Sequence, residues 1–393
     1  MSVLGTTARL LLATGASVVL AAFGAASASA AGPSGAPASA TPSHPARTVG
    51  AVFLQHNGID ANTVTAYARH ADGTLTEAGT YPTGGRGGAE QGAVVDPLAS
   101  QGGLTYDPRH QLLFAVNAGS DTISVFGVRG AALQLRQVLP SRGTFPSSIS
   151  VSGNLAYVLN AGGDGSISGY RVLGHRVFPI PGSTRSLGLG NDAVPFFLSA
   201  PGQVAISPDQ RHVVVTTKTH NTLVTWRLTD GIPGRDPVVT TSNGAVPFAL
   251  TFDEAGRLQV AEASGAVSSY AVSKSGSLSV ISGSVPNGQA ATCWSVQARG
   301  SLFVANAGSA TVSSYRVARD GSVSLRAAVA ARTGAGAVDL AVSADQRYLY
   351  QVAAGAGEID VFAVGVDGAL TPVTVLAGLP PASGTGMEGI AAY

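Results

Sequence analysis

The chain has 393 residues, of which 45% are hydrophobic and 11% are charged, and its formal net charge at pH 7 is +1. The apolar content excludes wholesale disorder, and the near-neutral charge gives no basis for nucleic-acid binding. Its 51 glycines and 21 prolines exclude a coiled coil and are typical of a chain with many turns. Composition therefore predicts a globular protein large enough to bury a substantial core, and it indicates no particular reaction.

The N-terminal segment predicts a secretory signal peptide over residues 1–30. Arg9 supplies a positive charge, Leu10 to Phe23 form an uncharged apolar run, and Ala28-Ser29-Ala30 matches a cleavage site after Ala30. The apolar run is shorter than a bilayer span of about 20 residues, so we expect no stable membrane anchor. Residues 31–48, with many Ala, Pro and Ser residues, are expected to form a flexible tether before a single domain over residues 49–393. The mature protein would then be secreted to the extracellular space.

A six-residue phrase recurs seven times, with an aliphatic residue at its third position and an aromatic residue at its sixth. The copies are Asn62–Tyr67, Asp121–Phe126, Gly165–Tyr170, Asn221–Trp226, Gly265–Tyr270, Ala310–Tyr315 and Gly357–Phe362. Hydrophobic segments and turn residues flank several copies, which predicts units of four antiparallel strands joined by hairpins. Seven units of about 45 residues are typical of a β-propeller, in which radial stacking buries both faces of each sheet. A pair of β-sandwiches is the alternative fold.

The ends of the repeat region predict how the ring closes. The first unit opens at Gly50–Gln55, which corresponds to a second strand, and no first strand precedes it. Residues Met387–Ala392 resemble the first strand of other units, such as Gly202–Ile206. We therefore expect the C-terminal strand to pair antiparallel with residues 50–55 and to complete the first blade. The predicted fold is an all-β, seven-bladed β-propeller of four-stranded antiparallel blades, closed by the C-terminal strand.

The repeat resembles that of a known family. The segment Phe114–Phe126 is similar to the repeat of the lactonase family of seven-bladed propellers, which includes bacterial 6-phosphogluconolactonase and the YVTN-repeat surface proteins. Ser207–Arg211 and Ser343–Arg347 are close to the family's Ser-Pro-Asp-Gly-Arg turn, with Gln in place of Gly. The resemblance covers residues 50–393 and implies a propeller that acts on lactones. It carries over no catalytic residue, because a repeat motif specifies packing rather than chemistry.

Candidate catalytic residues lie where the first strands of the blades begin. In a propeller these starts share one face with the turns between second and third strands and with the crossings between blades. The starts include Gln101, Ser147, Gln203, Asp339 and Glu388, which would form a polar ring at the channel mouth. Asp339 or Glu388 could be a general base that activates water against an ester carbonyl, and His56 or a rim arginine could donate to the oxyanion. Because Glu388 and His56 belong to neighbouring strands, we expect their side chains to lie close together. The alternative is a hydrated channel lining.

Arginine and lysine residues near the same mouth are candidate ligand-binding residues. The crossings carry Arg86, Arg142, Arg185 and Arg332, and Lys218 lies in a turn. Such side chains suit a carboxylate or a phosphate, although arginine in loops is also commonly just solvated. Two crossings, Thr83–Ser100 and Phe178–Ala200, are expanded, and long loops on a rigid scaffold often determine specificity. We expect both to lie on the face of the Asn117 and Asn306 turns.

Neither a cofactor nor a metal is expected from this sequence. The histidines match no zinc-binding spacing, and the only cysteine, Cys293, lies in an apolar stretch and is expected to be buried rather than nucleophilic. The sequence favours a secreted, monomeric, lactonase-like propeller that hydrolyses a small lactone or sugar-acid lactone at the channel mouth. The alternative function is a non-catalytic propeller that binds a partner, a glycan or a peptide, and neither function involves nucleic acid.

Overall fold

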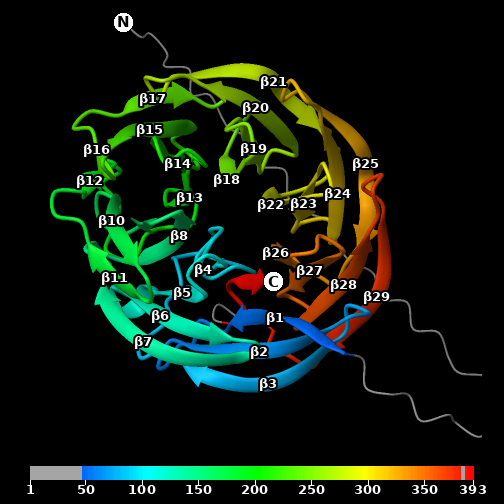
Figure 1. Cartoon of the computed structure of the whole chain (residues 1–393). Coiled ribbons are helices and arrows are strands. Elements are labelled where there is room, and N and C mark those ends of the chain that lie inside the picture. The colour runs from blue at the N-terminus through cyan, green and yellow to red at the C-terminus, as the bar shows by residue number, and fades with distance from the viewer. Residues whose placement is uncertain (1–46, 382–385) are drawn as a thin grey trace, which may run out of the picture. The chain divides into compact units, whose positions relative to one another are not determined.

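Seven β-sheets are arranged around a central axis in this protein (Figure 1). The structure is a computed structural model that describes residues 47–381 and 386–393, so the predicted signal peptide and nearly all of the predicted tether lie outside the described residues. Within those residues the single helical element is the short 3₁₀ helix η1 (Ala118–Ser120), and none is long and apolar enough to cross a membrane. The all-β, seven-bladed propeller is therefore confirmed.

The first four blades are built as follows, each from its innermost strand outward. They are β30 (Ile390–Ala392), β1 (Thr48–Gln55), β2 (Thr63–His70) and β3 (Leu75–Pro82); β4 (Leu104–Asp107), β5 (Leu112–Asn117), β6 (Thr122–Arg129) and β7 (Ala132–Pro140); β8 (Pro146–Ser152), β9 (Leu155–Asn160), β10 (Ser166–Leu173), β11 (Arg176–Pro179) and β12 (Arg185–Ser186); and β13 (Pro201–Ile206), β14 (His212–Thr217), β15 (Thr222–Thr229), β16 (Ile232–Pro233) and β17 (Val238–Thr241). In blades 3 and 4 the outermost strand is split into two short pieces, both paired with the third strand.

The last three blades each have four unbroken strands. They are β18 (Pro247–Phe252), β19 (Leu258–Glu262), β20 (Ala266–Val272) and β21 (Leu278–Pro286); β22 (Thr292–Ala298), β23 (Ser301–Asn306), β24 (Thr311–Val317) and β25 (Val323–Arg332); and β26 (Ala337–Val342), β27 (Tyr348–Ala353), β28 (Glu358–Val364) and β29 (Leu370–Ala377). Every strand pair within the blades is antiparallel, as hairpin connections require.

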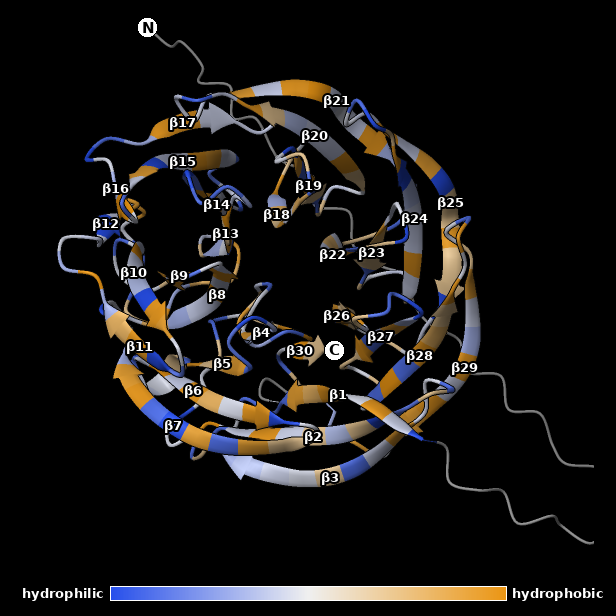
Figure 2. Cartoon of the chain, viewed as in Figure 1, coloured by the Kyte–Doolittle hydropathy of each residue, from blue (hydrophilic) through white to orange (hydrophobic). Residues whose placement is uncertain are grey.

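The core lies between neighbouring blades. The seven closing aromatics of the repeat are all buried: Tyr67, Phe126, Tyr170, Trp226, Tyr270, Tyr315 and Phe362. Second strands such as β5 and β9 are buried along their whole length on both faces, whereas the outer strand β7 is mostly exposed, with one buried residue. Figure 2 shows the hydropathy of these strands. Complete burial of one aromatic side chain contributes roughly 1.5–3 kcal/mol. The repeat is therefore the packing unit of the blade interfaces.

The C-terminal strand closes the ring in the predicted way. In Figure 1 the C-terminal β30 lies beside the N-terminal β1, and residues 390–392 pair antiparallel with residues 52–54. The pairing extends on both sides, because the amide of Glu388 donates to the carbonyl of Gln55 (2.8 Å) and the amide of Tyr393 donates to that of Ala51 (3.0 Å). The first blade thus takes its inner strand from the far end of the chain.

Both expanded crossings lie on one face of the propeller. The amide of Gln91 donates to the carbonyl of Pro195 (2.9 Å), and the amide of Phe197 donates back to the carbonyl of Gln91 (3.0 Å). The first crossing also contacts the turn at Gly119, and the second contacts the turn at Thr219. These are turns between second and third strands, so the predicted common face is confirmed. We call it the insertion face, and we call the opposite one, with the turns between first and second strands, the turn face.

Candidate functional site

The first crossing runs over the end of the central channel. The side chain of Gln101 makes two hydrogen bonds of 2.8 Å with the main chain of Ser295 in blade 6. The indole of Trp294 donates to the carbonyl of Ser100 (2.9 Å), and the hydroxyl of Ser100 donates to the carbonyl of Ser147 in blade 3 (2.8 Å). We call residues 90–101 the channel-crossing segment. It covers the starts of the inner strands, so Ser147, Asp339 and Glu388 of the predicted polar ring are buried, whereas Gln101 and Gln203 are half-buried.

Four carboxyl groups and one ammonium group are enclosed beneath this segment. They are Glu90, Asp96, Asp339, Glu388 and Lys218, none more than 4% exposed, and we call them the acidic cluster. The segment itself contributes Glu90 and Asp96, while Asp339 belongs to β26, Glu388 precedes β30 and Lys218 follows β14. Burial disfavours the ionised form of a carboxyl group. The pKa of each of the four carboxyls is accordingly raised.

Asp96 and Glu388 form a carboxyl–carboxyl pair. Asp96 accepts three backbone hydrogen bonds of 3.0 Å, from the amides of Leu98, Ala99 and Ser100, which favour its ionised form. Glu388 accepts one, from Leu98 (3.2 Å), and its Oε1 has no hydrogen-bond partner among the described residues. Burial is the main cause that raises the pKa of Glu388 well above its ordinary value, and the charge of the neighbouring Asp96 adds to the shift. Burial and the neighbouring charge of Asp96 therefore favour the protonated form of Glu388.

Lys218 anchors the channel-crossing segment rather than facing a ligand at the rim. Its Nζ donates to the carbonyl of Ala99 (2.8 Å), lies 3.5 Å from Oε2 of Glu90 and lies 5.6 Å from the centre of the Phe248 ring. Burial raises the pKa of Glu90 even though the Lys218 ammonium opposes the shift. The sequence suggested Lys218 as a ligand-binding residue at the mouth, and the structure buries its ammonium among acceptors of the protein itself.

Asp339 is the member of the cluster that reaches the channel. It lines a cavity of about 310 Å³ together with Gln101, Gln203 and residues of the inner strands. Its Oδ1 accepts the amide of Leu340 (2.8 Å), and its Oδ2 accepts the amide of Ile390 (3.3 Å). Burial is the main cause that raises its pKa to about 7, and the charge of Asp96 adds to the shift. A carboxyl that is half ionised near neutral pH is suited to general acid–base chemistry.

His56 does not join this cluster. Its Nε2 is 2.7 Å from the hydroxyl of Thr65 on β2, whereas the Glu388 carboxyl is directed at Leu98 and Asp96. Within residues 47–381 and 386–393 no hydrogen bond or ion pair joins His56 to Glu388, so the expected pair is not formed. Burial lowers the pKa of His56, which is the reverse of the effect that a carboxylate partner would have.

The glutamines of the predicted ring form hydrogen bonds with neighbouring inner strands, whereas the serine hydroxyl has no hydrogen-bond partner in the part of the chain that the structure describes. Gln203 lines the cavity, and its Oε1 accepts the amide of Leu250 in blade 5 (2.6 Å), while its Nε2 forms no hydrogen bond with a described residue. Ser147 is fully buried, and its hydroxyl has no hydrogen-bond partner among the described residues. Gln101 and Gln203 therefore remain as polar groups of the cavity, and Ser147 does not.

The predicted rim arginines are scattered and do not converge on the cavity. Arg185 donates to the carbonyls of Gly182, Thr184, Pro233 and Gly234, which joins the split outer strands of blades 3 and 4. Arg86 donates to the carbonyl of Gly119 (2.9 Å) on the insertion face. Arg142 and Arg332 are exposed, and no described residue forms a hydrogen bond or ion pair with either side chain. None of the four lines the channel cavity.

Sequence reasoning missed two members of the site, Glu90 and Asp96. The only available signal was their position: two acids inside an expanded crossing, in a chain with 22 acidic residues. Cys293 is buried as expected, and burial raises its pKa to about 12, which leaves the thiol protonated and unreactive. Across the part of the chain that the structure describes, no group of three or more His, Cys, Asp or Glu residues is arranged to hold a metal ion.

Comparison with known proteins gives the same fold. The family model described as "Lactonase, 7-bladed beta-propeller" matches residues 238–385. No curated protein matches the chain. Among solved structures, a protein from Lactobacillus plantarum shares 14% sequence identity with a TM-score of 0.64, over 88% of this chain and 100% of that one.

Two further solved structures carry functional names. A protein from Bacteroides uniformis, assigned provisionally as a 6-phosphogluconolactonase, shares 16% identity with a TM-score of 0.61, over 83% of this chain and 98% of that one. The periplasmic gluconolactonase PpgL from Pseudomonas aeruginosa shares 17% identity with a TM-score of 0.58, over 84% and 98%. At these identities the solved structures show the fold alone. Together with the family match, they confirm that this chain resembles the lactonase family of seven-bladed β-propellers.

Proposed function

We propose that this protein is a secreted lactonase-type hydrolase that opens a small lactone or sugar-acid lactone in the central channel. The observation that carries the proposal is Asp339, a carboxyl with a pKa of about 7 that lines the channel cavity beside two neutral amide side chains. The family match supports the same class of reaction. The cavity of about 310 Å³ is at the lower end of the range for small-molecule sites, which suits a compact ring.

The proposed chemistry uses groups that the cavity holds. Ionised Asp339 takes a proton from water as the water oxygen attacks the lactone carbonyl carbon. The Nε2 of Gln203, oriented by the hydrogen bond between its Oε1 and Leu250, donates to the developing oxyanion. When the tetrahedral intermediate collapses, the ring C–O bond breaks and protonated Asp339 returns the proton to the leaving alkoxide. Glu388 is enclosed away from the cavity, so its proposed role is to influence the charge on Asp339 through the acidic cluster.

The experiment is a pH-stat screen of the purified protein against aldonolactones and simple lactones of different ring size. We expect kcat/KM of the best substrate to rise with pH and to level off above about pH 7, as Asp339 ionises. Asp339→Asn should lower kcat by 10²-fold or more, because general bases typically contribute about 10²–10⁴-fold. The matched control is Asp360→Asn, which changes another buried aspartate of the same blade that does not line the cavity.

Two outcomes would contradict this assignment. Activity that survives Asp339→Asn would exclude Asp339 as the base, and equal loss in Asp360→Asn would indicate a structural effect. Absence of activity on every lactone would favour the second candidate function, a non-catalytic propeller. The burial of Glu388 and Asp96, neither of which lines the channel cavity, favours that alternative, because it leaves Asp339 as the only carboxyl of the acidic cluster that lines the cavity. Secretion is tested by expression in a secreting host, where the mature N-terminus is expected at Ala31.

A further inference from the structure

Two adjoining grooves on the turn face carry unpaired positive charge. The first lies between blades 4 and 5 and encloses about 490 Å³, and the second lies between blades 5 and 6 and encloses about 470 Å³. Both are lined by Glu254 and Ala255, so they meet at the first turn of blade 5. We call the pair the double groove. It is on the opposite face from the channel-crossing segment and shares no lining residue with the channel cavity.

Six cationic and three acidic side chains line the double groove. The cations are Arg211, Arg227, Arg257, Lys274, Arg299 and Arg319, and the acids are Asp209, Asp253 and Glu254. Two of the acids are committed to the turns that contain them. Asp209 accepts the Ser207 hydroxyl (2.6 Å) and the Arg211 amide (3.1 Å), and Asp253 accepts the amides of Ala255 and Arg257 and the guanidinium of Arg257. The six cations exceed the three acids by three, so the double groove carries a net positive charge.

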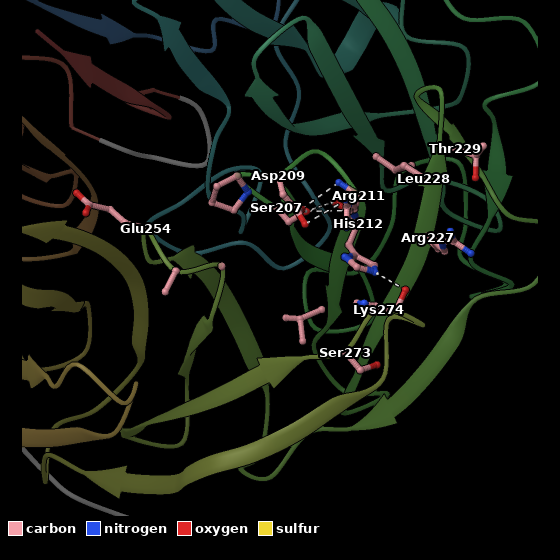
Figure 3. Close-up of a pocket in the computed structure, with 14 residues that line it drawn as sticks. Ser207, Asp209, Arg211, His212, Arg227, Leu228, Thr229, Glu254, Ser273 and Lys274 are labelled. Atoms are coloured by element: carbon pink, nitrogen blue, oxygen red, sulfur yellow. Dashed lines mark hydrogen bonds and ion pairs between the residues drawn. The ribbon is translucent and has the colours of Figure 1, made fainter.

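Four of the cationic side chains have no partner within the described residues. Arg227, Lys274, Arg299 and Arg319 form no ion pair or side-chain hydrogen bond there. Figure 3 shows Arg211, His212 and Lys274 following one another along the wall of the first groove, with the His212 ring against the Lys274 carbonyl (3.4 Å). His212 is buried and fixes the position of the backbone that carries Lys274. The first groove thus presents Arg211 and Lys274 from turns and Arg227 from β15.

The composition of the walls limits the class of ligand. Neither groove is lined by a tryptophan, tyrosine or phenylalanine, so the stacking surface that neutral sugars and single-stranded bases commonly use is not provided. What the walls offer is guanidinium groups, which bind carboxylates through paired hydrogen bonds. Because the two grooves adjoin, they suit an extended ligand with repeated negative charges better than a single small anion.

We propose that the double groove is a binding site for an acidic polysaccharide, a chain of sugar units that bear carboxylates, running across blades 4 to 6. Each groove binds one or more carboxylates of the ligand, and the turn at Glu254 separates the two grooves. The site is independent of the proposed hydrolase activity, because the channel cavity and the double groove share no lining residue. In a protein with both sites, the double groove would hold the molecule on a carboxylated polymer while the channel remained free.

The test measures binding of fluorescein-labelled hexagalacturonate by fluorescence anisotropy at low and at physiological ionic strength. We expect the dissociation constant of the triple variant Arg227→Gln/Lys274→Gln/Arg319→Gln to rise at least tenfold. The control triple variant is Arg109→Gln/Arg129→Gln/Arg136→Gln, which removes the same charge from exposed positions of blade 2. We expect the control to change the constant less than twofold, since it leaves the double groove intact. Lactonase activity should be unchanged in both triples.

Several results would overturn the proposal. If wild-type protein does not bind the hexagalacturonate at low ionic strength, the site does not exist. If both triple variants weaken binding equally, the effect is one of total charge and not of the double groove. If a neutral hexasaccharide binds as tightly, the carboxylates are not recognised. If duplex DNA of equal charge binds as tightly, the ligand class is wrong. Thermal melting of both triples verifies that they are folded.

Discussion

At the scale of single residues, the acidic cluster makes stability depend on pH. The carboxyl of Glu388 has a pKa well above 4.5 in the folded protein, because burial and Asp96 disfavour its charge. The folded state therefore binds more protons than the unfolded state as pH rises above 4.5, and the free energy of unfolding falls over that range. Asp339 acts in the same direction from about pH 4 up to its folded pKa of about 7. Asp96, Glu90 and Lys218 are the other charged groups that face this site.

Glu388→Gln tests this pH dependence. Glutamine cannot ionise, and its amide can still donate to Asp96, so the variant should lose less stability than the wild type between pH 5 and pH 8. One unit of raised pKa corresponds to about 1.4 kcal/mol, so the difference should be readily measurable by urea unfolding at each pH. The control is Glu254→Gln, which removes an exposed carboxylate and should leave the pH dependence unchanged. Parallel curves for wild type and Glu388→Gln would show that Glu388 ionises normally.

The residues of the site were only partly predictable from the sequence. The repeat correctly placed Asp339 and Glu388 at the starts of inner strands, because strand order follows from the register of the repeated phrase. The predicted pairing of Glu388 with His56 was wrong, because His56 contacts Thr65 instead. Gln55, the residue before His56, donates to the carbonyl of Val116. The actual partner, Asp96, lies in a segment without periodicity. The path of such a segment depends on tertiary contacts that no local pattern encodes.

At the scale of elements, the three-residue strand β30 has an importance out of proportion to its length. It supplies the inner strand of blade 1, its own Ile390 and Ala391 are buried, and so is Met387 just before it. Tyr393 stacks on Tyr106 with ring centroids 4.9 Å apart, and its carbonyl accepts the guanidinium of Arg69 (3.0 Å). Without these residues blade 1 would expose both an unpaired strand edge and an apolar face.

Deletion of residues 386–393 tests this closure. We expect the melting temperature to fall by more than 10 °C or soluble protein to be lost, since several buried side chains and an entire strand pairing disappear together. A synthetic peptide of residues 384–393, added to the truncated protein, should raise the melting temperature by restoring the pairing with β1, and a scrambled peptide should not. A truncated protein that melts like the full-length one would show that the ring does not depend on β30.

The elements themselves were largely predictable, with one exception that has a physical reason. Each repeated phrase lies at the start of a third strand, and its aromatic is buried, as the apolar pattern requires. The sequence did not indicate that the outermost strands of blades 3 and 4 are split into β11 and β12 and into β16 and β17. Outer strands are half exposed and contribute little to the core, so insertions such as Pro181–Thr184 and Gly234–Pro237 interrupt them without disturbing the repeat.

At the scale of the whole molecule, the formal net charge of +1 understates the positive charge of the folded protein. The count treats every carboxyl as ionised, yet the four carboxyls of the acidic cluster and Glu262 are buried with raised pKa values. Each of these that keeps its proton removes one negative charge from the total. Most of the arginines, by contrast, remain exposed and ionised, which contributes to the attraction expected of the double groove for a polyanion.

Isoelectric focusing of the protein, native and in urea, tests this imbalance. Unfolding returns the buried carboxyls to water and to ordinary pKa values, so the unfolded chain releases protons and becomes more negative. We therefore expect the native protein to focus at a higher pH than the urea-unfolded protein. The double substitution Glu388→Gln/Glu90→Gln should narrow the gap, because it removes two groups whose ionisation differs between the states. A native protein that focuses at or below the unfolded one would mean that the acidic cluster is ionised, and that the surface is no more positive than the sequence implies.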